Sequence, residues 1–180
     1  MHNKLKIIFL ASLVLFAAGC SSVKILPTDI GPDFLLSNYK SYDFFQIDAE
    51  IDPFPEFDKR IGWIKEELKN QLELKGLNQT KENPDLLINI GIVIEEKIQT
   101  RETDFRTDAP RYMGTRNYSW KSEEIEVRRY NKGTVTVDII SAENKVLEWQ
   151  GVAQGVIVKK DEASKKNIAV GAQKMFENIE

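Results

Sequence analysis

The chain has 180 residues and is mildly acidic, with 25 lysines and arginines against 28 aspartates and glutamates. A charge so near balance gives no basic excess to hold the protein on nucleic acid. We therefore expect no nucleic-acid partner.

The first 19 residues have the pattern of a lipoprotein signal peptide. Two lysines near the start precede an uncharged apolar run at residues 7–18. That run is shorter than the roughly 20 apolar residues that a membrane-spanning helix needs, so it is typical of a targeting segment. Ala18 and Gly19 then precede Cys20, as a pair of small residues precedes the cysteine of a lipobox. We expect cleavage between Gly19 and Cys20, and covalent lipid on Cys20.

The alternative is an ordinary signal peptide, which would leave Cys20 as an exported thiol. Ala17 stands where a lipobox most often has leucine, so the match to that pattern is incomplete. However, the chain has no second cysteine, and an unpaired thiol fits an oxidising compartment poorly. Lipidation is therefore favoured, with residues 20–33 as a short tether that holds a candidate first strand at 23–26.

The mature chain lacks the side chains on which many enzymes depend. Cleavage of the signal peptide removes His2, the one histidine of the chain, and Cys20 is expected to carry lipid. This excludes Ser-His-Asp and Cys-His nucleophile systems and the common zinc, copper and haem ligand sets. We expect a protein that is not an enzyme and that has no cofactor besides its lipid.

Residues 34–180 are long enough for one domain, and their hydrophobic periodicity predicts two helices. Apolar residues at three- and four-residue spacing predict a helix over Phe57–Lys75 that ends at Gly76. A second helix is predicted over Asp161–Asn178, with Asp161 as its cap.

The strand patterns predict an antiparallel sheet. The strongest is Leu86–Ile94, where isoleucines and leucines alternate with more polar residues. Other strands are predicted at 41–47, 134–140 and 146–158. The predicted fold is α+β, an antiparallel sheet of about four to six strands with two helices packed on one face.

Residues from about 99 to 132 lack a core-facing pattern and are predicted to form a long polar loop, with a candidate strand at 125–130. Guanidinium groups beside exposed aromatic rings suit carboxylates, phosphates and sugar faces. The alternative is a mobile tip without a binding role, because Glu102, Asp104 and Asp108 offset much of the positive charge. The candidate ligand or partner residues are Arg101, Arg106, Arg111, Tyr112, Arg116, Tyr118 and Trp120.

Several short strings occur in an order that resembles one known family. They are Tyr39–Phe44, Lys75–Leu77, Asn83–Leu87, Gly133–Asp138, Leu147–Ala153, Ala169–Val170 and Lys174–Phe176. In this order, behind a lipobox, they resemble the envelope lipoproteins called domain of unknown function 4136. The resemblance implies an α+β domain on a lipid anchor and implies no catalytic or ligand site. It also implies the periplasmic face of the outer membrane, since Ser21 and Ser22 carry no sorting signal for the inner membrane or the cell surface, which are the alternatives.

Together these patterns predict a membrane-anchored envelope lipoprotein that acts as a binding or structural module. Its partners would be the membrane, through the lipid, and an envelope protein or glycan. The alternative is a hydrolase of cell-wall glycan, which requires two carboxyl groups roughly 5–10 Å apart in one cleft. The candidates for such a pair are Glu95, Glu96, Glu123, Glu124, Glu126 and Asp138.

Overall fold

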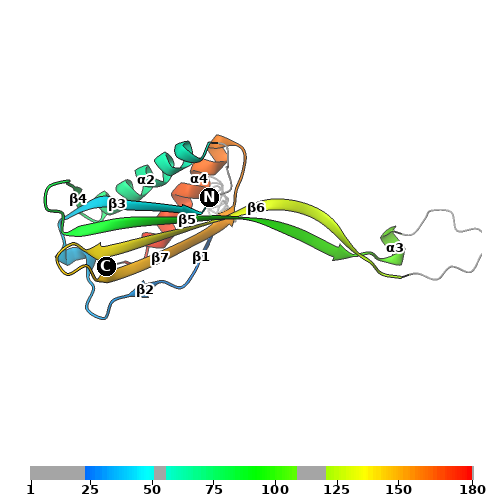
Figure 1. Ribbon diagram of the computed structural model, residues 1–180, viewed down its shortest axis with the longest axis horizontal. Helices are drawn as coiled ribbons and strands as arrows, with labels where there is room; N and C mark the ends of the chain where they lie inside the picture. Colours follow the sequence, from blue (N-terminus) through cyan, green and yellow to red (C-terminus); the bar gives the residue numbers. More distant parts are fainter. Residues whose placement is uncertain (1–22, 51–55, 109–120, 180) are drawn as a thin grey trace, which may run out of the picture.

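The computed structural model describes residues 23–50, 56–108 and 121–179, and Figure 1 shows their arrangement. These residues form a mixed α+β fold, as predicted. In chain order the elements are β1 (Lys24–Ile25), β2 (Asp29–Ile30), the 3-10 helix η1 (Leu36–Asn38), β3 (Ser41–Glu50), α2 (Phe57–Leu74), β4 (Asn78–Gln79), β5 (Leu86–Glu102), α3 (Phe105–Asp108), β6 (Glu124–Ser141), β7 (Leu147–Val156) and α4 (Asp161–Phe176). The predicted signal peptide, with Gly19 and Cys20, lies outside the described residues.

The strands of the described residues form one seven-stranded sheet in the order β1-β7-β6-β5-β3-β4, with β2 also paired to β7. β5, β6 and β7 are antiparallel neighbours, as predicted. β3, however, runs parallel to both β5 and β4, so the prediction of a purely antiparallel sheet is wrong at this edge. The physical reason is α2, which carries the chain back along the sheet between β3 and β5 and so makes the next strand enter in the same direction.

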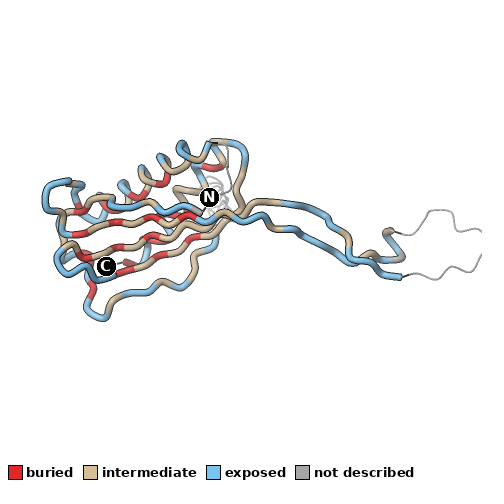
Figure 2. Tube along the Cα trace, viewed as in Figure 1, coloured by how far each residue is buried: buried red, intermediate tan, exposed pale blue. Residues whose placement is uncertain are grey.

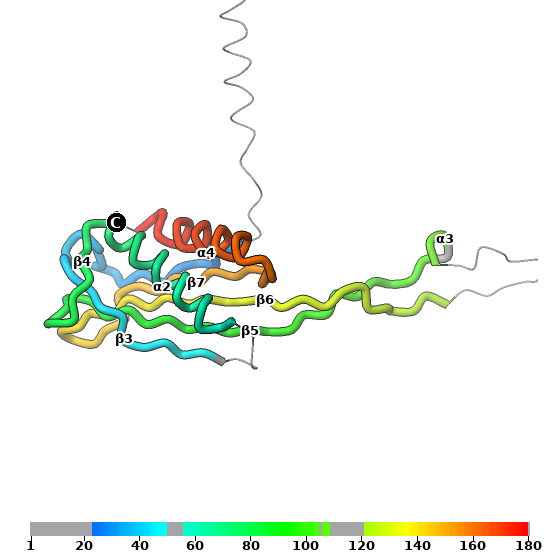
Figure 3. The backbone as a smooth tube through the Cα atoms, turned by 90° about the horizontal axis from the view of Figure 1, so that it is seen from above, coloured from blue at the N-terminus to red at the C-terminus, as the bar shows by residue number. Residues whose placement is uncertain are grey.

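α2 and α4 pack against each other over one face of the sheet, as predicted (Figures 1 and 3). α2 ends at Leu74, and Gly76 has a φ of 91°, the left-handed conformation that commonly follows a helix. α4 begins at Asp161, but no side-chain hydrogen bond caps it, so the predicted role of Asp161 as a cap is wrong. The Asp161 carboxylate instead pairs with Lys59 of α2 and joins the two helices.

The core between the helices and β7 is built around Trp149, which is 2% exposed. Its ring packs on Phe176 of α4, with the ring centroids 5.2 Å apart. Gly151 lies two residues further along the same face of β7, where an added Cβ would lie 2.7 Å from Trp149 Cζ2 and 2.6 Å from Met175 Cγ. The absence of a side chain at Gly151 therefore lets the indole lie over the strand beneath α4.

The long polar loop predicted at 99–132 is largely a pair of strands. β5 continues to Glu102 and β6 begins at Glu124, and their residues pair along the whole length with a bulge between Gln99 and Thr100. The candidate strand at 125–130 is thus confirmed as part of β6. Outside residues 125–130, this pair of strands escaped prediction because both of its faces carry polar side chains, so it lacks the alternation of a half-buried strand.

We expect Gly151→Ala to lower the free energy of unfolding by about 1–3 kcal/mol, the usual range for overpacking a core. Urea titration of the purified protein measures this change. Gly62→Ala is the matched control, because nothing lies within 4 Å of a Cβ at this exposed position of α2. It should raise stability by about 0.5–1 kcal/mol through helix propensity. Equal effects of the two substitutions would show that the indole does not need the space above Gly151.

Candidate functional site

β5 and β6 extend past their neighbours and form a two-stranded arm, which we define as residues 95–102 and 124–132 (Figure 1). The pairing of β5 with β3 ends at Val93, and the pairing of β6 with β7 begins at Lys132. Beyond these positions the two strands pair only with each other among the described residues. At about 3.3 Å per residue the arm is roughly 25 Å long.

Most residues of the arm are exposed to solvent (Figure 2). Arg129 bonds Glu126 through Nη2 at 2.8 Å, but exposed ion pairs of this kind add little stability. An isolated two-stranded ribbon is itself only marginally stable in water. Ile98 and Val127 remain 51% and 53% exposed. The arm therefore offers charged and apolar surface that the described part of the domain does not cover.

Arg101 and Asp108 join α3 to the outer end of β5. Both terminal nitrogens of Arg101 donate to the Asp108 carboxylate, Nη1 at 2.7 Å. The same carboxylate accepts the Asp104 backbone N–H and the Thr107 hydroxyl, each at 2.9 Å. The hydrogen bonds from Arg101, and then that from the Asp104 N–H, hold the pKa of the Asp108 carboxyl well below its usual range. Arg101 therefore orders α3 against β5.

The structure describes two of the predicted ligand or partner residues, Arg101 and Arg106. Arg106 is an exposed residue of α3 whose backbone N–H donates to the Asp104 carboxylate at 3.0 Å. The others, Arg111, Tyr112, Arg116, Tyr118 and Trp120, lie outside the described residues and stay a prediction. Sequence analysis missed the pairing of Arg101 with Asp108, because a spacing of seven residues indicates no contact until the turn between them is known.

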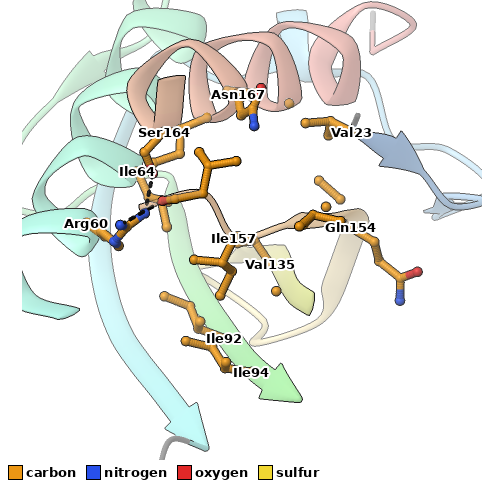
Figure 4. Close-up of a pocket in the computed structure, with 18 of the residues that line it drawn as sticks. Val23, Arg60, Ile64, Ile92, Ile94, Val135, Gln154, Ile157, Ser164 and Asn167 are labelled. Carbon is orange, nitrogen blue, oxygen red and sulfur yellow. Dashed lines mark hydrogen bonds between the residues drawn. The ribbon is translucent and has the colours of Figure 1, made fainter. Parts of the chain in front are cut away.

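A second candidate site is an apolar cavity of about 140 Å³ between the sheet, α2 and α4 (Figure 4). Aliphatic side chains from six segments line it, among them Val23, Ile61, Ile94, Val135, Ile157 and Ile168. Sequence analysis did not predict this cavity, because its lining has the same pattern as ordinary core positions.

The cavity lies at the end of the sheet where the core residues become less buried. At one end of the sheet, which we call the far end, Leu72, Leu86 and Ile139 are all 0% exposed. Burial falls toward the other end, the cavity end, where β7 finishes and α2 begins. The same apolar rows continue there as half-buried side chains, namely Phe57, Ile61, Ile94, Val135 and Ile168.

Arg60 of α2 links the two helices at the edge of the cavity. Its Nη2 donates to the Val158 carbonyl at 3.0 Å, and its Nη1 donates to the Ser164 hydroxyl of α4. Figure 4 shows Arg60 on one side of the cavity and Val23 on the opposite side. The hydrogen bonds of Arg60 therefore lie on one side of the cavity, whereas Val23, the first described residue of the chain, lies on the other side.

The carboxylates predicted for a glycan hydrolase share no cleft, and one pair, Glu96 and Glu126, meets only at the exposed guanidinium of Arg129. Glu95 and Glu96 lie at the base of the arm, whereas Glu124 lies near its outer end, about 20 Å away at the usual rise per residue. Asp138 lies on the sheet face away from the helices, where Gln150 donates to it at 2.8 Å. None of them lines the apolar cavity or the polar hollow between Tyr39, Asp85 and Ser141.

Glu124 and Glu126 are near neighbours on β6, but their surroundings do not suit catalysis. Hydrogen bonding by Arg129 lowers the pKa of the Glu126 carboxyl, whereas a catalytic acid needs a raised pKa. Glu124 accepts a hydrogen bond from the Thr100 hydroxyl on the exposed arm. The pair therefore lies on an open ribbon and not in a cleft.

Two general features of the described chain also bear on function. No group of three or more His, Cys, Asp or Glu side chains is placed there to hold a metal ion. None of the helices in residues 23–50, 56–108 and 121–179 is long and apolar enough to cross a membrane.

The geometry defines an α+β domain in which two helices cover one face of a mixed sheet. The model of a family described as "Domain of unknown function (DUF4136)" matches residues 27–179. The chain belongs to this family, which confirms the resemblance found in its sequence. No curated protein matches the chain at a significant level.

Three solved structures are similar to this fold at low sequence identity. A PDZ domain protein from Parabacteroides distasonis is 16% identical with a TM-score of 0.48; the match covers 92% of this chain and 39% of that one. A PelC dodecamer from Paraburkholderia phytofirmans is 11% identical with a TM-score of 0.45, over 86% of this chain and 96% of that one. A minor lipoprotein from Acinetobacter baumannii is 12% identical with a TM-score of 0.38, over 78% and 90%. With TM-scores below 0.5, these likenesses carry no functional conclusion.

We expect the contact of Arg101 with Asp108 to persist in mild acid. Because the folded-state pKa of Asp108 is depressed, its contribution is present above the unfolded pKa of about 3.9 and is lost only as the pH falls through the lower folded value. Amide-exchange protection of residues 101–108, corrected for intrinsic rates, should therefore be the same at about pH 4.5 as at pH 7.

Asp108→Asn should remove most of this protection at both pH values while leaving the melting temperature of the domain unchanged, since the arm is remote from the core. Glu102→Gln, at an exposed neighbour on β5, is the matched control. Loss of wild-type protection between neutral pH and about pH 4.5 would contradict the assignment.

Proposed function

We propose that the protein is a lipid-anchored envelope protein that binds or positions a partner at the periplasmic face of the outer membrane. Support for the anchor comes from the lipobox pattern at Ala18–Cys20, from the family to which the chain belongs, and from the absence of a second cysteine. Ser21 and Ser22 supply no signal for the inner membrane or the cell surface, which stay the alternative locations.

The start of the described chain indicates which end of the domain would face the membrane. β1 pairs antiparallel with β7, with Lys24 opposite Gln154, so the chain enters at the cavity end and runs toward the far end. Cys20 precedes Val23 by three residues, a reach of about 10 Å at full extension. A lipid on Cys20 would therefore hold the cavity end, from which the arm also leaves, close to the membrane.

The observation that carries the binding role is the arm. A ribbon with two unpaired edges is prone to unwanted association, and charged side chains along both strands reduce that risk. Ile98 and Val127 nevertheless stay exposed on it. Because the ribbon adds little to the stability of the domain, contact with an envelope protein or glycan is the role that best accounts for its length.

The glycan hydrolase is not favoured by any observation among the described residues. Its carboxylates are spread along the arm and the open sheet face, and they share no described cleft.

In-cell photo-crosslinking tests the binding role. A photoreactive amino acid at Ile98 or Val127 should give adducts of the same discrete mass, because both side chains lie on one short ribbon. The control position is Val146, which is 50% exposed but lies before β7 at the far end, and it should give only background. Positions Tyr112 and Trp120 test whether the predicted ligand residues take part. Background labelling from all four positions, Ile98, Val127, Tyr112 and Trp120, would overturn the binding role and indicate that the arm acts only as a spacer.

A further inference from the structure

The apolar layer between the helices and the sheet continues to the cavity end, but the side chains there do not fill the space between them. On β5, burial changes from Leu86 at 0% exposed to Ile92 at 5%, and Ile94 is only half-buried. α2 shows the same trend from Leu72 to Ile61, with the remaining space forming the cavity. Covering apolar surface with an apolar group is favourable in proportion to the area removed from water, so the cavity favours an apolar occupant.

The size and lining of the cavity define the class of that occupant. Its volume of about 140 Å³ is close to that of an engineered apolar cavity of about 150 Å³ that stays dry and binds benzene. A space of this size accepts the end of one hydrocarbon chain and not a whole lipid. The half-buried isoleucines and valines around it favour methylene groups over polar ones.

The position of Val23 indicates where such a chain would come from. Val23 lines the cavity and packs on α4, where its Cγ1 would lie 3.4 Å from a Cβ added to Gly171. Only Ser21 and Ser22 separate Val23 from Cys20. The peptide from Cys20 to Val23 spans at most about 10 Å. An acyl chain on Cys20 that folds back over this distance therefore reaches the cavity. On the opposite side, the bonds of Arg60 join α2 to Ser164 of α4 and to Val158 in the segment before α4 (Figure 4).

We propose that the end of one acyl chain carried by Cys20 occupies this cavity. The inference rests on the proposed lipid anchor and goes beyond it, because it gives the lipid a second role. A chain seated between α2, α4 and β6 would fix the orientation of the domain on the membrane, which a flexible tether alone cannot do. It would also set the direction in which the arm leaves the membrane surface.

Intramolecular photolabelling tests this proposal on the full chain in cells. Cells are supplied with a palmitic acid analogue that carries a diazirine near its methyl end, irradiated, and the protein is purified and mapped by peptide mass spectrometry. We expect label on the segments that line the cavity, residues 153–158 and 164–172. Label should be absent from residues 139–147 at the far end.

Val135→Phe fills the cavity from β6 and should lower this labelling by about tenfold, because the added ring takes the space of the chain. Thr136→Phe is the matched control, since Thr136 is the next residue on β6 and faces the other side of the sheet, and it should leave the labelling unchanged. Ile168→Phe fills the same space from α4 and repeats the test if Val135→Phe does not fold.

Each remaining outcome is decisive. Cavity labelling that persists in Cys20→Ala would show that the occupant is a free fatty acid or a neighbouring lipid, which overturns the proposal. An acylated wild-type chain without label in the cavity, or equal labelling in Val135→Phe and Thr136→Phe, would also overturn it and would leave the lipid anchor standing. A wild-type chain that takes up no acyl group at all would refute the proposed function itself.

Discussion

Trp149 lies over Gly151 and beneath Met175 and Phe176, and this contact fixes α4 on β7 at the far end of the sheet. Around it the core is closed, with Leu72 of α2 fully buried. Toward the cavity end the helices are instead joined by polar bonds at their surfaces, and apolar packing thins out. The core is thus closely packed at the far end and less well packed at the cavity end. The arm and the cavity both lie at the cavity end.

Three features come together at the cavity end: the first described strand, the base of the arm, and the cavity itself. β1 and the middle of β6, where the arm begins, both lie next to the last residues of β7, as the register of Lys24 and Thr134 with Gln154 shows. The proposed lipid on Cys20 would bring this end to the membrane. The arm would then start close to the lipid surface, whereas the far end, with its sealed core, would face the periplasm.

Sequence patterns predicted the elements that bury one face and expose the other. α2, α4 and the buried half of β5 each have one apolar face, and periodicity located them to within a few residues. It could not show that β3 runs parallel to β5, because strand direction depends on where the crossover helix packs. Apart from residues 125–130, the arm was not predicted as strand, because a ribbon exposed on both faces has the composition of a loop. The cavity could not be predicted, because periodicity shows which positions are apolar and not whether their side chains fill the space between the helices and the sheet.

Three of the strings that carry the family resemblance supply contacts that stabilise the fold. The Asp85 carboxylate accepts the backbone N–H groups of Lys40 and Ser41 at 2.9 and 3.0 Å, and Trp149 with Gly151 seats α4. The resemblance therefore reports architecture, and the account of function depends on the anchor. Metabolic labelling with a radioactive fatty acid tests that anchor most directly. The wild-type chain should become labelled and Cys20→Ala should not, whereas label of equal intensity on Cys20→Ala would contradict the account.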